Sequence, residues 1–149
     1  MDDLLGSVAG LPLHPLVVHG VVVLLPLLAL LTVLVAFVGR WANAAWPVVA
    51  GNVVVTVMAL VARASGQKLE AALPVESDAI DRHTQLGAVL PLFALGVLVA
   101  SVVVALLRGN ARLRWLGVGL AVVAGAAAIV WTVLTGHSGS VAVWDGIMP

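Results

Sequence analysis

Long apolar runs separated by short polar segments form the main pattern of this chain. The runs lie at 16–38, 46–62, 86–107 and 113–134. Each has about 17 residues or more, which is enough for a helix to cross a hydrocarbon core of about 30 Å. Polar and apolar residues do not alternate along the runs as they do in barrel strands. The backbone can therefore satisfy its hydrogen bonds inside a bilayer only as helices.

The pattern predicts an all-α fold, an integral membrane four-helix transmembrane bundle in a single domain over residues 1–149. We expect helices at about 16–38, 46–64, 83–107 and 113–135, with an outer loop at 65–82. Gly66 is expected to end the second helix. The segment 135–139 is expected to turn the chain back over the bundle after the fourth helix, because its two glycines make it flexible.

Composition supports a membrane protein surrounded by a lipid bilayer. Hydrophobic residues make up 62% of the chain and charged residues 9%, whereas soluble domains carry roughly 25% charged residues. The absence of cysteine excludes thiolate metal sites and haem attached through a C-x-x-C-H motif. A net charge of zero without a basic patch excludes nucleic-acid binding. The sequence shows no nucleophile and base that would converge as in an enzyme.

Charge distribution predicts the orientation. The segments 39–45 and 108–114 carry four arginines and no acid, whereas every acid lies in the N-terminal segment, the 63–85 connection or the C-terminal tail. Positive residues favour the cytoplasmic side, so both termini are expected on the extracytoplasmic side. The arginines are Arg40, Arg108, Arg112 and Arg114.

The fourth run carries a stripe of small residues at spacings of three and four, which is typical of a close helix contact. This seam either meets a helix of the same chain or a second copy, so a homodimer stays open. Its members are Gly117, Ala121, Ala124, Gly125 and Ala128.

All four histidines fall at run ends that the predicted topology brings to one face of the membrane. Imidazoles gathered beside apolar helices indicate a ligand site. His19 lies within the first turns of its helix and is expected to need a partner inside the bundle. His83 shares a helix face with Gly87 and other small residues, so we expect it to point inward. The other two histidines are His14 and His137.

Several of these residues belong to motifs that resemble the DUF2231 family of small bacterial membrane proteins. The resemblance covers nearly the whole chain. It implies four spans, a multi-pass location in the bacterial cytoplasmic (inner) membrane, and a suspected haem-binding role. The chain departs from the family at two places. The family often has an aromatic residue and proline where this chain has Gly20 and Val21, and an acid where this chain has Gln67 and Lys68. The motifs are Leu13-His14-Pro15-Leu16-Val17-Val18-His19-Gly20, Gly66, Asp81-Arg82-His83 and Thr135-Gly136-His137-Ser138-Gly139-Ser140-Val141.

Haem b is the first candidate ligand, because its apolar porphyrin fits between helices and its iron takes two axial histidines. We expect His19 and His83 as the axial pair, Gly87 to leave space for the porphyrin, and Arg63 or Arg82 to pair with the propionates. The function implied is an electron carrier of cytochrome b type near the outer face of the membrane, serving a redox partner protein, rather than an enzyme in its own right.

Two alternatives stay open. In the first, three or four of His14, His19, His83 and His137 bind a copper, zinc or iron ion directly, because imidazole suits all three metals. In the second, the chain is a cofactor-free membrane scaffold whose histidines hydrogen-bond among themselves.

Overall fold

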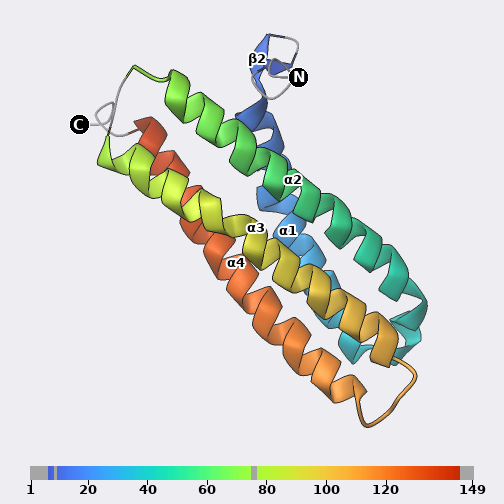
Figure 1. Ribbon diagram of the computed structural model, residues 1–149. Helices are drawn as coiled ribbons and strands as arrows, with labels where there is room; N and C mark the ends of the chain where they lie inside the picture. The colour runs from blue at the N-terminus through green and yellow to red at the C-terminus, as the bar shows by residue number, and fades with distance from the viewer. Residues whose placement is uncertain (1–6, 9, 75–76, 145–149) are drawn as a thin grey trace.

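Four long helices make up most of the structure, a computed structural model that describes residues 7–8, 10–74 and 77–144. The helices run alternately in opposite directions, and short turns join them (Figure 1). The predicted all-α four-helix bundle is therefore confirmed. The helices are α1 Leu13–Phe37, α2 Ala45–Ala72, α3 Asp78–Leu107 and α4 Arg114–Trp144, and a 3₁₀ helix, η1 Gly39–Ala44, connects α1 to α2.

A small hairpin precedes α1 and was not expected from the apolar pattern. Strand β1, Ser7–Val8, pairs antiparallel with strand β2, Leu11–Pro12. Gly10 in the turn has a φ of 81°, in the left-handed region that favours glycine.

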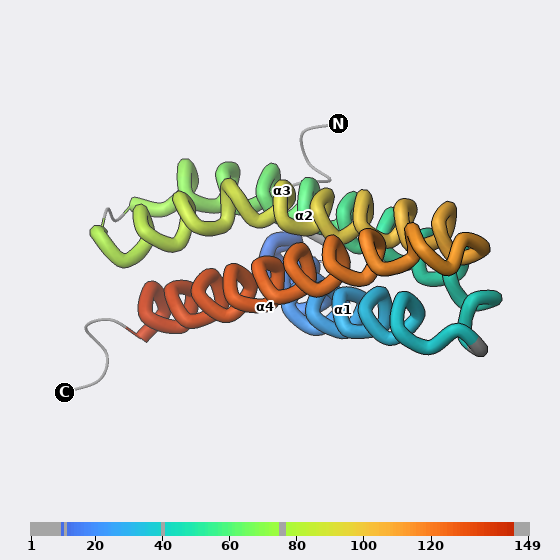
Figure 2. Tube along the Cα trace, turned by 90° about the horizontal axis from the view of Figure 1, so that it is seen from below, coloured from blue at the N-terminus to red at the C-terminus, as the bar shows by residue number. Residues whose placement is uncertain are grey.

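The helices form two layers, with α2 and α3 in one and α1 and α4 in the other (Figure 2). Helix α1 packs on α2 and α4, and α3 packs on the same two helices. Helices α1 and α3 are thus diagonal neighbours across the bundle axis. We call the end where α2 joins α3 the histidine end, and the end holding η1 and the α3–α4 turn the arginine end.

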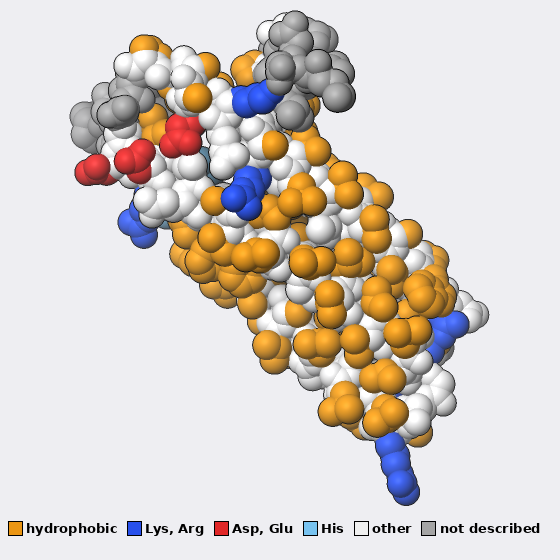
Figure 3. Space-filling model, viewed as in Figure 1, with side chains coloured by type: hydrophobic (Ala, Val, Ile, Leu, Met, Phe, Trp, Pro, Cys, Tyr) orange, Lys and Arg blue, Asp and Glu red, His pale blue; other side chains and the backbone are white. Residues whose placement is uncertain are grey.

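Each of the four helices is long and apolar enough to cross a membrane. Large apolar side chains cover the outside of the bundle, whereas the acidic side chains visible in Figure 3 gather at the histidine end. An apolar surface of this extent needs lipid as its solvent. The protein is therefore a multi-pass membrane protein. Examples more than half exposed are Val23 on α1, Val54 on α2, Leu92 on α3 and Val123 on α4.

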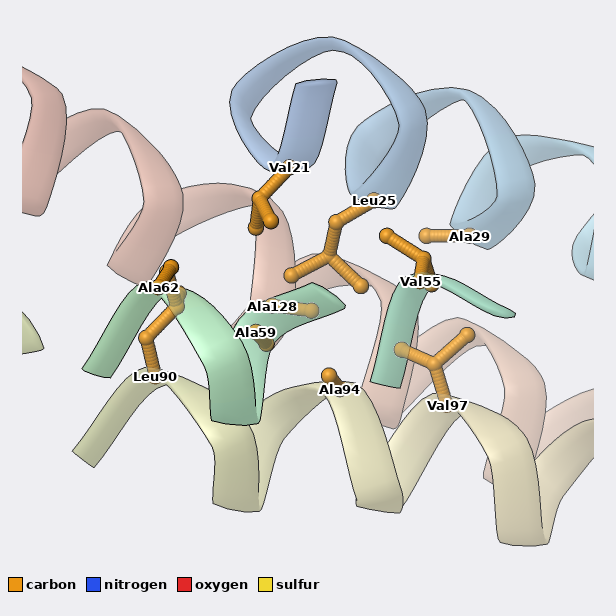
Figure 4. Packing of buried hydrophobic residues seen from close by; sticks show 10 residues of the cluster. All are labelled: Val21, Leu25, Ala29, Val55, Ala59, Ala62, Leu90, Ala94, Val97 and Ala128. Atoms are coloured by element: carbon orange, nitrogen blue, oxygen red, sulfur yellow. The ribbon is translucent and has the colours of Figure 1, made fainter. Parts of the chain in front are cut away.

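Small residues let the four helices approach one another in the core. Every helix contributes a fully buried alanine to the packing shown in Figure 4, and Leu25 fills the space between them. Close backbone approach is the main source of helix association in lipid, where burial of apolar groups gains little. The four alanines are Ala29, Ala59, Ala94 and Ala128.

A polar contact within the core joins α1 and α2. The side-chain amide of Asn52 on α2 donates a hydrogen bond of 3.1 Å to the hydroxyl of Thr32 on α1. Both side chains are buried. Interhelical hydrogen bonds of this kind contribute about 0.6 kcal/mol on average in membrane proteins.

Three helices extend beyond their expected bounds at the histidine end. Helix α2 continues to Ala72, α3 begins at Asp78 and α4 continues to Trp144, so the expected outer loop at 65–82 is wrong over most of its length. Pro74 follows the end of α2, and the hydroxyl of Ser77 caps α3 by accepting a hydrogen bond from the Ile80 amide at 3.2 Å. These two signals set the helix ends.

The glycines expected to end helices lie inside them instead. Gly66 is within α2, and Gly136 and Gly139 are within α4, so the segment 135–139 does not turn back over the bundle. A helical glycine costs only about 1 kcal/mol relative to alanine, which the packing of a long helix can outweigh. Gly66 and Gly139 are also positions where a neighbouring side chain comes very close.

Candidate functional site

Two of the four histidines meet between the helices near the histidine end. His14 is the second residue of α1, and His83 lies in the second turn of α3. Their ring centroids are 6.2 Å apart and the ring planes cross at 73°. Because α1 and α3 are diagonal neighbours, the pair joins opposite corners of the bundle.

The ring of His14 is held against α2. Its Nδ1–H donates a hydrogen bond of 2.9 Å to the carbonyl of Ala62. One turn further along α2, Gly66 makes room for the ring, since a Cβ atom at this position would lie 2.8 Å from Cε1 of His14. The glycine is therefore required by the close approach of an imidazole.

The ring of His83 is held in the same way against α4. Its Nδ1 lies 3.2 Å from the carbonyl oxygen of Thr135 and 3.1 Å from the hydroxyl oxygen of Ser138. A Cβ atom at Gly139 would lie 3.0 Å from Cε1 of His83. Carbonyl, hydroxyl and glycine again fix one imidazole.

The contacts of the two rings follow one arrangement, which we call the half-site. It consists of a backbone carbonyl, a serine three residues later and a glycine four residues later. The hydroxyl of Ser65 donates to the Ala62 carbonyl at 3.1 Å, as that of Ser138 donates to the Thr135 carbonyl at 2.8 Å. Each half-site receives a histidine from the preceding helix. The local contacts on α2 are thus repeated on α4.

The hydrogen bonds define which ring nitrogen is free. A carbonyl oxygen only accepts, so each ring carries a proton on Nδ1, and in the neutral imidazole the lone pair is then on Nε2. Metal-binding histidines are commonly oriented by such a bond from one ring nitrogen to a backbone carbonyl. In their neutral form, both imidazoles therefore have the tautomer that binds a metal through Nε2.

The residues that hold the two rings are small and buried. Ala62, Ser65 and Ser138 are each at least nine-tenths buried, and both serine hydroxyls are satisfied within their own helices. The carboxylate of Glu70, near the end of α2, acts electrostatically on His83. Within residues 7–8, 10–74 and 77–144, no group of three or more His, Asp or Glu side chains is arranged to hold a metal ion.

His19 does not join this pair, and the expectation that its ring points into the bundle is wrong. The side chain is exposed, and its Nδ1–H donates to the Pro15 carbonyl of its own helix at 2.6 Å. Five residues along a helix rotate a side chain by about 140°. Because His14 faces inward, His19 faces outward.

His137 lies beside the pair rather than in it. It is exposed and lines a pocket of about 160 Å³ between α3 and α4, together with Arg82, Leu86 and Ser138. Arg63 is exposed on α2 next to Ala62. Gly87, one turn along α3 from His83, has open space where a Cβ atom would be.

Sequence reasoning missed the residues that hold the rings, namely Ser65, Ser138 and the carbonyls of Ala62 and Thr135. The signal present in the sequence is the Ser-Gly pair, which occurs at Ser65-Gly66 and again at Ser138-Gly139. Glycine is also typical of helix ends and flexible turns, so the sequence alone does not reveal what the repeated pair does.

Fold and site together define a multi-pass membrane protein with a pair of histidines near one end of its four spans. The family model for a predicted membrane protein, DUF2231, matches residues 10–147, and the chain belongs to this family. The match includes both histidines of the pair and both half-sites. Comparison with curated proteins and with solved structures finds no match.

Proposed function

We propose that His14 and His83 are the axial ligands of a haem b, and that the protein is an electron carrier of cytochrome b type in the bacterial cytoplasmic membrane. The observation that carries the proposal is the pair of imidazoles from diagonal helices, each with Nδ1–H bound to a carbonyl and Nε2 free. His14 takes the place that His19 has in the sequence-based hypothesis.

The spacing of the rings fits one metal atom between them. A metal about 2.0 Å from a nitrogen of each imidazole, on a straight line, puts the ring centroids about 6 Å apart. The observed separation is 6.2 Å.

The number of ligands supports haem. A six-coordinate haem iron takes two ligands from the protein, and two imidazoles from facing helices are a common pair in bundles. Gly66 and Gly139 give each ring a place that a Cβ atom would fill. Arg63 and Arg82, both exposed at the histidine end, are the candidates for the propionates. A bound haem would supply one-electron transfer to a redox partner protein.

Replacing either ligand tests the assignment. His14→Ala and His83→Ala should each remove the sharp reduced α-band of low-spin haem, because one axial nitrogen is lost, whereas His19→Ala and His137→Ala should keep it. The measurement is the absorption spectrum of the detergent-purified protein, oxidised in air and then reduced with dithionite, with iron determined on the same sample.

Two results would contradict the proposal in different ways. Loss of the α-band in His19→Ala with retention in His14→Ala would show that haem binds through another pair. A wild-type protein purified from haem-sufficient cells with a flat spectrum and no iron would exclude haem as its resident ligand.

A bare metal ion is the second candidate, favoured by the same 6.2 Å separation, which an ion fits without a porphyrin. Two neutral imidazoles suit copper, and Glu70 is a nearby source of a carboxylate. Stoichiometric copper or zinc without an α-band would support this candidate. A colourless and metal-free protein would instead be the scaffold in which the histidines contact each other.

A further inference from the structure

Two arginines of the arginine end meet around one opening. Arg108 follows the end of α3, and one of its terminal nitrogens donates to the Ala42 carbonyl in η1 at 2.9 Å. Arg114 begins α4, and one of its terminal nitrogens donates to the Phe37 carbonyl at the end of α1 at 3.1 Å. Both side chains line a pocket of about 40 Å³, together with Gly39 and Ala42.

The pocket combines positive charge with unused hydrogen-bond donors. A guanidinium has five N–H groups, so each arginine keeps donors beyond the one bound to a carbonyl. The Nε of Arg114 is buried and has no hydrogen-bond partner among the described residues. The described acids Glu70, Asp78 and Asp81 all belong to the histidine end of α2 and α3. Nothing anionic from these residues offsets the two guanidinium groups.

The depth of the pocket in a membrane is indicated by aromatic residues. Trp41, Trp46 and Trp115 are exposed at the arginine end, and the guanidinium of Arg114 lies 5.2 Å from the ring centroid of Trp115. Tryptophans concentrate at the level of the lipid headgroups. The two arginines therefore lie where lipid phosphates are abundant.

We propose that Arg108 and Arg114 bind the phosphate of an anionic phospholipid at the arginine end. A volume of about 40 Å³ is roughly three times what one water needs, which suits phosphate oxygens entering from the headgroup layer. Arginine forks match phosphate geometry, and basic pockets between transmembrane helices bind anionic headgroups. The inference is independent of the ligand at the histidine end.

Native mass spectrometry of the detergent-purified protein with added phosphatidylglycerol tests the site. We expect Arg108→Gln and Arg114→Gln each to lower lipid retention by about fivefold. Arg112→Gln, at an exposed position that does not line the pocket, is the matched control and should retain the lipid. Equal loss in all three variants would overturn the proposal in favour of a net-charge effect.

Two further measurements keep the proposal testable if a variant fails to fold. A photoactivatable phosphatidylglycerol bound to the wild-type protein should label residues 35–42 and 104–114, and labelling confined to other segments would overturn it. Inorganic phosphate at millimolar concentration should not displace the lipid. Displacement would mean that the pocket is a site for free phosphate.

Discussion

At the scale of residues, the imidazole pair depends on glycines that give the rings space. His14 and His83 could be named from the sequence as candidates, because histidine is rare and costly beside apolar helices. The sequence could not show that these two histidines pair, since their pairing depends on where α1 begins relative to α2. A shift of one residue in that start rotates the helix face by about 100°. The choice between His14 and His19 therefore required the structure.

Gly66→Ala should disturb the site without altering a ligand. The new methyl group would lie 2.8 Å from Cε1 of His14, so the ring must move. We expect a loss of about 1–3 kcal/mol in stability, typical of overpacking, and reduced ligand occupancy. Thermal unfolding and ligand content measure the two effects.

Gly96→Ala on α3 is the matched control, because no atom lies within 4 Å of where its Cβ atom would be. It should leave ligand content unchanged and make the helix equally stable or slightly more stable. If both alanine variants behaved alike, the His14 ring would not lie against Gly66.

At the scale of elements, α4 uses its small-residue face within the chain. Gly117, Ala121, Gly125 and Ala128 are buried; Gly117 lies against Val104 of α3, and Gly125 lies against Ala29 and Val33 of α1. The sequence predicted the seam but left its partner open, because spacing alone does not say which helix fills a groove. Contacts with α1 and α3 now account for it.

A bulky residue in this seam should separate the helices. Ala121→Leu introduces side-chain volume at a position that is 1% exposed, and we expect a loss of about 1–3 kcal/mol in stability. Ala126→Leu makes the same change at an exposed position of α4 and should have little effect. Unfolding in mixed detergent micelles compares the two. Equal losses would show that Ala121 does not face the core.

The ends of the helices were the least predictable elements. The apolar runs stop near residues 62 and 134, but α2 and α4 continue for about ten further residues with more polar sequences. Hydropathy identifies the part of a helix that is surrounded by lipid. The ends of the helices are set by local signals such as the Ser77 cap and Pro74. At the histidine end, the bundle therefore continues past the start of α1 as α2, α3 and α4 alone.

At the scale of the whole molecule, the charges differ between the two ends. The arginine end has the four arginines of its turns, and the described acids lie at the other end. The sequence predicted this distribution correctly, because charges lie outside the apolar runs. Under the positive-inside rule the arginine end faces the cytoplasm, which is the orientation we propose.

Single-cysteine labelling tests the orientation, since the chain has no cysteine of its own. Asn110→Cys, exposed in the α3–α4 turn, should resist a membrane-impermeant maleimide in intact cells and react after lysis. Leu73→Cys, exposed between α2 and α3, should react in intact cells. The reverse pattern would place the histidine end in the cytoplasm.

The two half-sites have a consequence for the history of the protein. Two copies of a helical hairpin, packed side by side around a twofold axis, would already bring one imidazole each to the axis. Duplication and fusion of a gene for such a hairpin would leave the arrangement found here, with Ser65-Gly66 and Ser138-Gly139 as its repeated marks. In such an ancestor the site would have formed between two chains, and fusion would have made it a permanent part of one.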